Sequence, residues 1–195
     1  YKLYYMFILY KEIMKDKILN AYKNKKLIGI YTDSNNSDSF SVGYILYVDE
    51  LSYILYEISP YGKFDGYSCN LIEDIIKLEE DSIYLNNIKK LISYYNIEIN
   101  YISIDESSAI IFGFLEFIQS TKKICSILSC NSNVFDIVGF VKRINQNSVE
   151  ISLVNENSEK DGLVEINLDS IEKIVFNSND EVKLEILYNL NMNKK

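Results

Sequence analysis

The chain contains no histidine among its 195 residues. Histidine is the commonest general base and a common metal ligand, so its absence excludes His-based catalytic triads and His-ligated metal centres. Arg143 is the only arginine, which removes most of the bidentate hydrogen bonding that proteins use for phosphate and guanine. The sequence also lacks a phosphate-binding loop, a dinucleotide fingerprint and a nucleophile elbow. We therefore expect neither enzymatic activity nor a cofactor.

Cysteines are few, and no apolar run is long. The three cysteines, Cys69, Cys125 and Cys130, are an odd number without a paired framework, which is typical of a reducing compartment and predicts a cytoplasmic protein. Cys125 and Cys130 have no further soft ligands nearby, so we expect no metal site. The apolar run at residues 3–10 is too short to span a bilayer and has no cleavage site behind it. We expect no membrane partner.

Acidic residues outnumber basic residues along the whole chain. The 28 acidic and 20 basic residues give a net charge of −8, made up of 11 basic against 13 acidic in residues 1–97 and 9 against 15 in residues 98–195. Such a surface repels nucleic-acid phosphate at long range unless its few cations gather in one place. The charge therefore disfavours a nucleic-acid partner.

What the chain does contain is self-similarity at a spacing of 96 residues. Val42-Gly43 recurs as Val138-Gly139, and Asp65-Gly66 recurs as Asp161-Gly162. Sliding residues 26–92 onto 122–188 without a gap gives twelve identities, and conservative pairs fall in the same frame. This spacing predicts an internal duplication and two domains. The repeated glycines are expected to let a strand bend, and the repeated aspartates to cap turns.

Each half shows the same order of local signals, namely a helix, five short strands and a second helix. The strands are predicted at 26–33, 41–49, 52–59, 65–72 and 74–80, and again at 122–130, 136–145, 148–155, 162–168 and 170–177. The helices are predicted at 11–24, 82–95, 107–120 and 178–190, with single helical turns at 71–75 and 168–171. Ser107 or Ser108 could cap the third helix. Isoleucines alternate within residues 96–106, which favours an ordered strand there over a flexible tether.

The predicted fold class is α+β and rich in β structure. Five short strands cannot lie flat and still enclose a core this small, so closing them into a strongly bent small barrel is the economical solution. Each of two tandem repeats would carry an N-terminal helix, such a barrel and a C-terminal helix. The expected boundaries are an irregular N-terminal extension at 1–13, repeat 1 at 14–95, a linker at 96–106 and repeat 2 at 107–191.

This order of elements, with Val-Gly in the second strand and Asp-Gly before the fourth, resembles the Sm-like and SH3-like small barrels. More closely, it is similar to an uncharacterised group of bacterial proteins that carry such barrels in tandem. Sm-like proteins bind RNA and form rings, so the resemblance raises RNA binding as an expectation. The sequence contains no matching RNA-contact motif, and that activity is not carried over from the resemblance.

Three aromatic side chains and a lysine form the most partner-like cluster in the sequence: Tyr61, Lys63, Phe64 and Tyr67. Aromatic rings beside a cation can bind a partner protein or stack on nucleic-acid bases. The second half has Asn157, Glu159, Lys160 and Leu163 at these positions, so the halves are not equivalent here. This difference favours one specialised face, although packing of one or two of the rings in the core is an equally good interpretation.

The leading functional prediction is a non-enzymatic, cytoplasmic adaptor that binds another protein through this cluster or through exposed sheet edges. The alternative is binding of RNA or single-stranded nucleic acid through the lysines that follow each first helix: Lys23, Lys25, Lys26, Lys122 and Lys123. Those lysines also complement the negative end of a helix dipole, which is the simpler interpretation.

Overall fold

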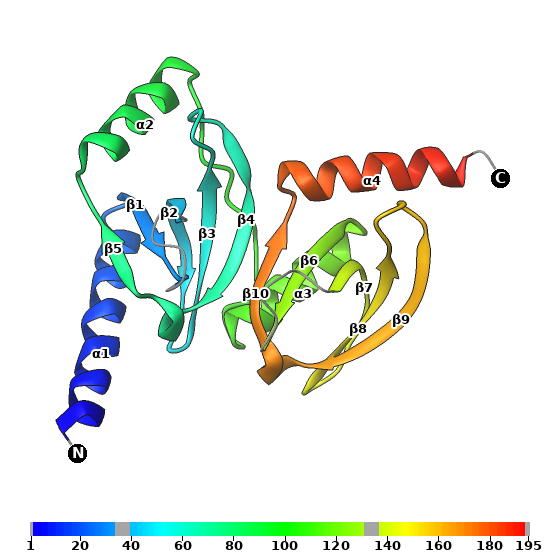
Figure 1. Cartoon of the computed structure of the whole chain (residues 1–195), viewed down its shortest axis with the longest axis horizontal. Coiled ribbons are helices and arrows are strands. Elements are labelled where there is room, and N and C mark those ends of the chain that lie inside the picture. The colour runs from blue at the N-terminus through cyan, green and yellow to red at the C-terminus, as the bar shows by residue number, and fades with distance from the viewer. Residues whose placement is uncertain (1, 34–39, 131–136, 194–195) are drawn as a thin grey trace. The chain divides into compact units, whose positions relative to one another are not determined.

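The computed structural model describes residues 2–33, 40–130 and 137–193, and it is an α+β structure rich in strands (Figure 1). Asn35 and its counterpart Asn131, which contribute to the sequence repeat, lie outside the described residues. The helices are α1 (Lys2–Lys23), α2 (Ile83–Tyr94), α3 (Ile110–Thr121) and α4 (Asn179–Met192). The strands are β1 (Leu27–Tyr31), β2 (Ser41–Val48), β3 (Ser52–Ile58), β4 (Phe64–Leu71), β5 (Lys77–Glu79), β6 (Ile124–Ser129), β7 (Ile137–Ile144), β8 (Ser148–Val154), β9 (Lys160–Asn167) and β10 (Ile171–Phe176).

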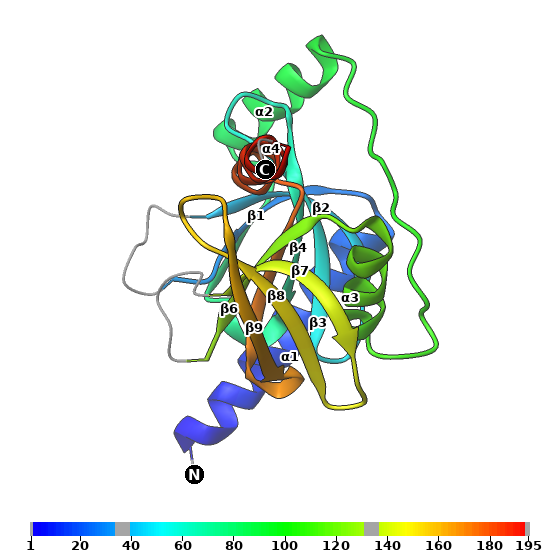
Figure 2. The same cartoon turned by 90° about the vertical axis from the view of Figure 1, so that its right-hand side faces the viewer.

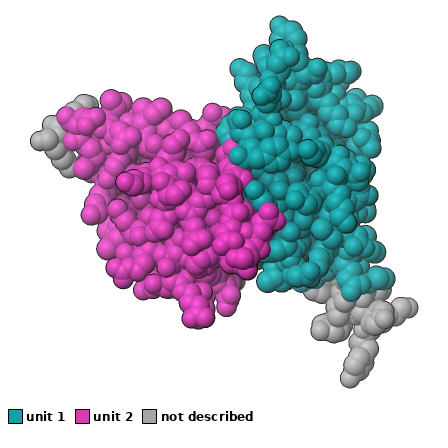
Figure 3. Space-filling view, turned by 180° about the vertical axis from the view of Figure 1, so that it is seen from behind, with its two compact units in different colours: residues 1–65, 70–101 teal, residues 66–69, 102–195 magenta. Residues whose placement is uncertain are grey.

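The strands follow one antiparallel order, β5-β1-β2-β3-β4-β10-β6-β7-β8-β9, which begins at β5, ends at β9 and does not close. The chain divides into two compact units (Figure 3). Unit 1 comprises residues 1–65 and 70–101, and unit 2 comprises residues 66–69 and 102–195. The middle of β4 therefore belongs to unit 2, where it lies beside β10.

Elements in the two halves keep the spacing of 96 residues. β7, β8 and β9 each begin and end 96 residues after β2, β3 and β4, and the single 3-10 turns at Ile72–Asp74 and Leu168–Ser170 keep the same spacing. The pairing of β2 with β3 shifts register between Ile45 and Tyr47, and that of β7 with β8 shifts between Val141 and Arg143. An irregularity at the same place in both halves bends the two pairs of strands alike.

Gly43 and Gly139 are required by a close approach between neighbouring strands. A Cβ atom at Gly43 would lie 2.1 Å from the carbonyl oxygen of Tyr56, and one at Gly139 would lie 2.1 Å from that of Ser152. Backbone atoms cannot yield as the end of a side chain can, so only glycine fits. The repeated glycine is therefore part of the scaffold, as the sequence indicated.

Each unit has a core of aliphatic and aromatic side chains beneath its first helix. In unit 1, Met14, Ile18 and Ala21 of α1 pack in one cluster with buried residues of β1, β2 and β3. In unit 2, Phe114 and Ile118 of α3 are completely buried, and Figure 2 shows α3 beside strands β7 and β8.

Several local predictions are wrong. α1 begins at Lys2, so residues 2–10 continue the helix that was predicted to start at residue 11. α3 begins at Ile110 after Ala109, which makes no capping hydrogen bond, so neither Ser107 nor Ser108 caps it. Residues 96–106 contain no strand, because their alternating isoleucines find no partner strand. Among the described helices, none is long and apolar enough to cross a membrane.

Candidate functional site

The structure does not bring the four predicted partner residues onto one surface. Tyr61 is 75 % exposed, whereas Tyr67 is 7 % exposed and stacks near Phe176, with ring centroids 6.4 Å apart. Phe64 is half-buried, and its ring centroid lies 4.7 Å from that of Tyr56. Both rings thus contribute to packing. Since successive side chains of a strand point to opposite faces, Phe64 and Tyr67 pack on different faces of β4.

Tyr61 and Lys63 remain at the surface, close to the end of α2. Gly62 lies so close to α2 that a Cβ atom there would be 2.3 Å from that of Leu91. The ammonium nitrogen of Lys63 lies 5.1 Å from the ring centroid of Tyr95, within the range of a cation–π interaction. Of the four predicted partner residues, Lys63 thus contacts an aromatic ring that the sequence did not predict, and Tyr61 stays exposed.

The five lysines proposed for nucleic-acid binding have separate environments. Lys26 pairs with Glu80 at 3.1 Å, Lys25 lies 5.8 Å from the ring centroid of Tyr101, and Lys23 ends α1. The ammonium of Lys123 donates to the side-chain oxygen of Asn177 at 3.4 Å. Lys122 follows α3 in a left-handed conformation and lines a hollow in unit 2.

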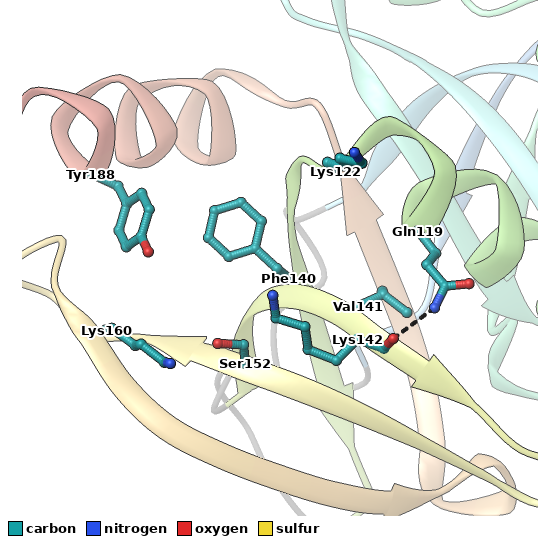
Figure 4. Close-up of a pocket in the computed structure, with 8 residues that line it drawn as sticks. All are labelled: Gln119, Lys122, Phe140, Val141, Lys142, Ser152, Lys160 and Tyr188. Carbon is teal, nitrogen blue, oxygen red and sulfur yellow. Dashed lines mark hydrogen bonds between the residues drawn. The ribbon is translucent and has the colours of Figure 1, made fainter. Parts of the chain in front are cut away.

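This hollow has a volume of about 460 Å³ and lies between α4, the end of α3 and strands β7, β8 and β9 (Figure 4). The rings of Phe140 and Tyr188 contact one another on one side, with centroids 5.2 Å apart. Lysines from three different elements stand around it. The lining residues are Gln119, Lys122, Phe140, Val141, Lys142, Ser152, Lys160 and Tyr188.

The hollow exists because large side chains of unit 1 have no counterparts in unit 2. The residues 96 positions before Ser152 and Lys160 are Tyr56 and Phe64, whose rings contact each other. Tyr56 is 1 % exposed, and burial raises the pKa of its hydroxyl. A serine and a lysine in place of two rings in contact leave space beneath α4.

The lining of the hollow is basic and aromatic. Besides the three lysines, it contains the hydroxyl of Ser152 and the phenol of Tyr188. Within the described ranges, no group of three Cys, Asp or Glu side chains could hold a metal ion. Three lysines beside two aromatic rings can instead attract an anion that has a flat apolar part.

A second feature missed by sequence reasoning is the way α4 is attached to unit 2. Polar side chains anchor it: Glu181, which is 5 % exposed, accepts hydrogen bonds from the Ser126 hydroxyl at 2.6 Å and from the Ser178 amide at 3.0 Å. Glu185, one turn later, accepts from the Ile124 amide at 3.3 Å. The capping box formed by Ser178 and Glu181 thus also fixes the orientation of the helix.

The opposite face of α4 is exposed and carries four aliphatic side chains, with Lys183 among them. Val182, Ile186 and Leu190 follow at intervals of four residues and lie on one face, with Leu187 beside them. Their exposed fractions run from 39 % to 55 %. Most of the aliphatic side chains of this helix therefore face away from unit 2. We call these four residues the α4 stripe.

Periodicity alone could not reveal the α4 stripe, because it does not say which face of a helix is anchored. The hollow could have been found by comparing the two halves position by position. That comparison pairs Lys160 with Phe64, Lys142 with Leu46 and Ser152 with Tyr56.

No protein-family model matches the chain, and neither does any curated protein or solved structure.

Proposed function

We propose that the chain is a non-enzymatic adaptor that binds another protein through the α4 stripe. The observation that carries this proposal is that α4 exposes the four aliphatic side chains of the stripe, while Glu181, Glu185 and the ring of Tyr188 attach the helix to unit 2. A surface helix normally buries its apolar face. An exposed stripe on a helix fixed by buried hydrogen bonds is suited to an apolar groove on a partner protein.

The α4 stripe supplies part of the energy that a specific interface needs. Ile186 and Leu190 are 55 % and 53 % exposed. Burying the exposed half of such a side chain is worth about 1 kcal/mol, so the four residues together offer about 4 kcal/mol.

The same proposal includes the scaffold, which we infer to be a tandem pair of Sm-like or SH3-like small barrels made by duplication. Its support is the constant spacing of 96 residues between β2, β3, β4 and their counterparts, and the equal environments of Gly43 and Gly139. The order β5-β1-β2-β3-β4 in the first half also corresponds strand for strand to β10-β6-β7-β8-β9 in the second. The three cysteines, an odd number without a paired framework, support a reducing compartment, the cytoplasm.

A photo-reactive benzoylphenylalanine placed at position 186 tests the α4 stripe. In extract from the cells that make this protein, it should cross-link one defined protein, and the additional change Leu190→Glu should remove that adduct. Benzoylphenylalanine at Ile83 is the matched control, because Ile83 is an isoleucine on α2 that is 82 % exposed. It should not give the same adduct.

Two outcomes would contradict the proposal. One is an adduct at position 186 that survives Leu190→Glu, or no adduct at all. The other is micromolar binding of a labelled single-stranded oligonucleotide with a steep dependence on salt, which would favour the nucleic-acid alternative through Lys122, Lys123 and the lysines after α1.

A further inference from the structure

The hollow in unit 2 is a second site, separate from the α4 stripe. We propose that it binds a small nucleoside phosphate, with the phosphates at the lysines and the flat base against Phe140 or Tyr188. This proposal does not depend on the protein-binding function, since the α4 stripe lies on the opposite face of α4 from Tyr188.

The lysines of the hollow are available for an anion. Lys122, Lys142 and Lys160 come from the end of α3, from β7 and from β9, and Figure 4 shows all three at the rim of the same hollow. None of these three lysines forms an ion pair with a described residue, whereas Lys11, Lys15 and Lys26 of unit 1 each do. Three ammonium groups around one hollow, none of them in a salt bridge with a described residue, attract phosphate oxygens.

The remaining lining fits the rest of a nucleotide. The half-buried rings of Phe140 and Tyr188 are inclined at 58°, so each can offer a face to a planar base. Ser152 is 4 % exposed and lies on the floor of the hollow, where its hydroxyl can donate or accept one hydrogen bond. A volume of about 460 Å³ is within the usual range of small-molecule sites.

The comparison with unit 1 argues against a mere packing defect. Three apolar residues of unit 1, Leu46, Tyr56 and Phe64, are replaced in unit 2 by Lys142, Ser152 and Lys160. Leu46 and Tyr56 are buried, 3 % and 1 % exposed, while Phe64 is half-buried. A loss of volume alone would leave a dry apolar cavity, whereas here the space is opened and given positive charge at the same time.

The size and charge of the surroundings favour a single nucleotide over a nucleic-acid strand. Residues 98–195 carry 9 basic and 15 acidic side chains, a net charge of −6. A long polyanion would meet that repulsion at every phosphate beyond the hollow, whereas a mononucleotide places its charge only where the lysines are.

Isothermal titration of the full chain with ADP at low salt tests the proposal. We expect saturable binding with a Kd below about 1 mM, weaker binding of AMP, and very weak binding of adenosine or of inorganic phosphate alone. Lys142→Gln and Lys160→Gln should each weaken ADP binding at least about fivefold. Lys183→Gln is the matched control, because Lys183 is exposed on α4 and does not line the hollow, and its Kd should stay within about twofold.

A variant that fills the hollow gives an independent test. The double change Ser152→Tyr and Lys160→Phe installs the residues of unit 1, Tyr56 and Phe64, and should abolish ADP binding while the circular dichroism spectrum stays native. If this variant fails to fold, the affinity of the single variant Lys160→Gln for ADP tests the proposal instead, because Lys160 lies on the exposed strand β9.

Three results would overturn the proposal. The first is no saturable ADP binding below about 1 mM. The second is binding that is unchanged in both Lys142→Gln and Lys160→Gln. The third is tight binding of a ten-nucleotide strand that ADP does not displace, which would show a strand-binding surface in place of a nucleotide site.

Discussion

Truncating the rings at positions 61, 64 and 67 one at a time separates a surface role from a core role within a single stretch of seven residues. Tyr61, Phe64 and Tyr67 differ in burial from 75 % exposed through half-buried to 7 % exposed. The changes Tyr61→Ala, Phe64→Ala and Tyr67→Ala should therefore cost increasing amounts of unfolding free energy.

The expected costs follow from what each ring contacts. Tyr61→Ala removes a ring that is mostly in water and should change stability by at most about 0.5 kcal/mol. Phe64→Ala loses about half of a buried phenyl group and the ring contact with Tyr56, together about 2 kcal/mol. Tyr67→Ala empties a buried site beside Phe176 and should cost about 3 to 5 kcal/mol.

Urea denaturation followed by circular dichroism measures these costs, provided that the slope of unfolding free energy against urea is the same in all variants. The order of the midpoints should be wild type, Tyr61→Ala, Phe64→Ala and Tyr67→Ala, from high to low. A loss above about 1 kcal/mol for Tyr61→Ala, or below about 1 kcal/mol for Tyr67→Ala, would refute the assignment of these rings to surface and core.

Gly139→Ala should destabilise unit 2 by more than about 3 kcal/mol, because the new Cβ would lie 2.1 Å from the Ser152 carbonyl oxygen. Gly29→Ala, whose Cβ would first meet the Phe40 ring at 3.2 Å, should cost much less, and equal thermal shifts for the two would contradict this reasoning. Burial, with the nearby charge of Glu181, raises the pKa of the Cys125 thiol from 9.0 to about 12. Below pH 9 this pKa difference leaves the free energy of unfolding unchanged. As pH rises from 9 to 12, only the unfolded thiol ionises, and the free energy of unfolding falls by up to about 1.4 kcal/mol per pH unit. At pH 8, a thiol reagent should modify exposed Cys130 rapidly and Cys125 only on unfolding, and fast modification of both would contradict the burial.

Most secondary structure could be predicted from the sequence, because it depends on local periodicity and turn residues. The predicted strands at 41–49 and 148–155 differ from β2 and β8 by one residue at one end. The third helix shows where this fails. Ser107 and Ser108 have the chemistry of a cap, but the chain first turns at Asp105, whose carboxylate accepts from the Ser107 amide at 2.9 Å.

The candidate sites were less accessible to prediction, because they depend on which side chains share a space. The sequence cluster at 61–67 contains the right kinds of residue, but the alternation of β4 places Tyr67 in the core. Lys142 and Lys160 are 18 positions apart in the sequence, and no local pattern links them, whereas the fold places both at one hollow.

By itself, the sequence determined the class of secondary structure, the spacing of 96 residues between equivalent elements and the absence of histidine chemistry, since each of these is a property of residue types and their order. Only the tertiary structure decided which face of α4 is anchored and which lysines surround a hollow. Those facts follow from burial and hydrogen bonding between distant segments, such as the bond from Ser126 to Glu181, which no local pattern specifies.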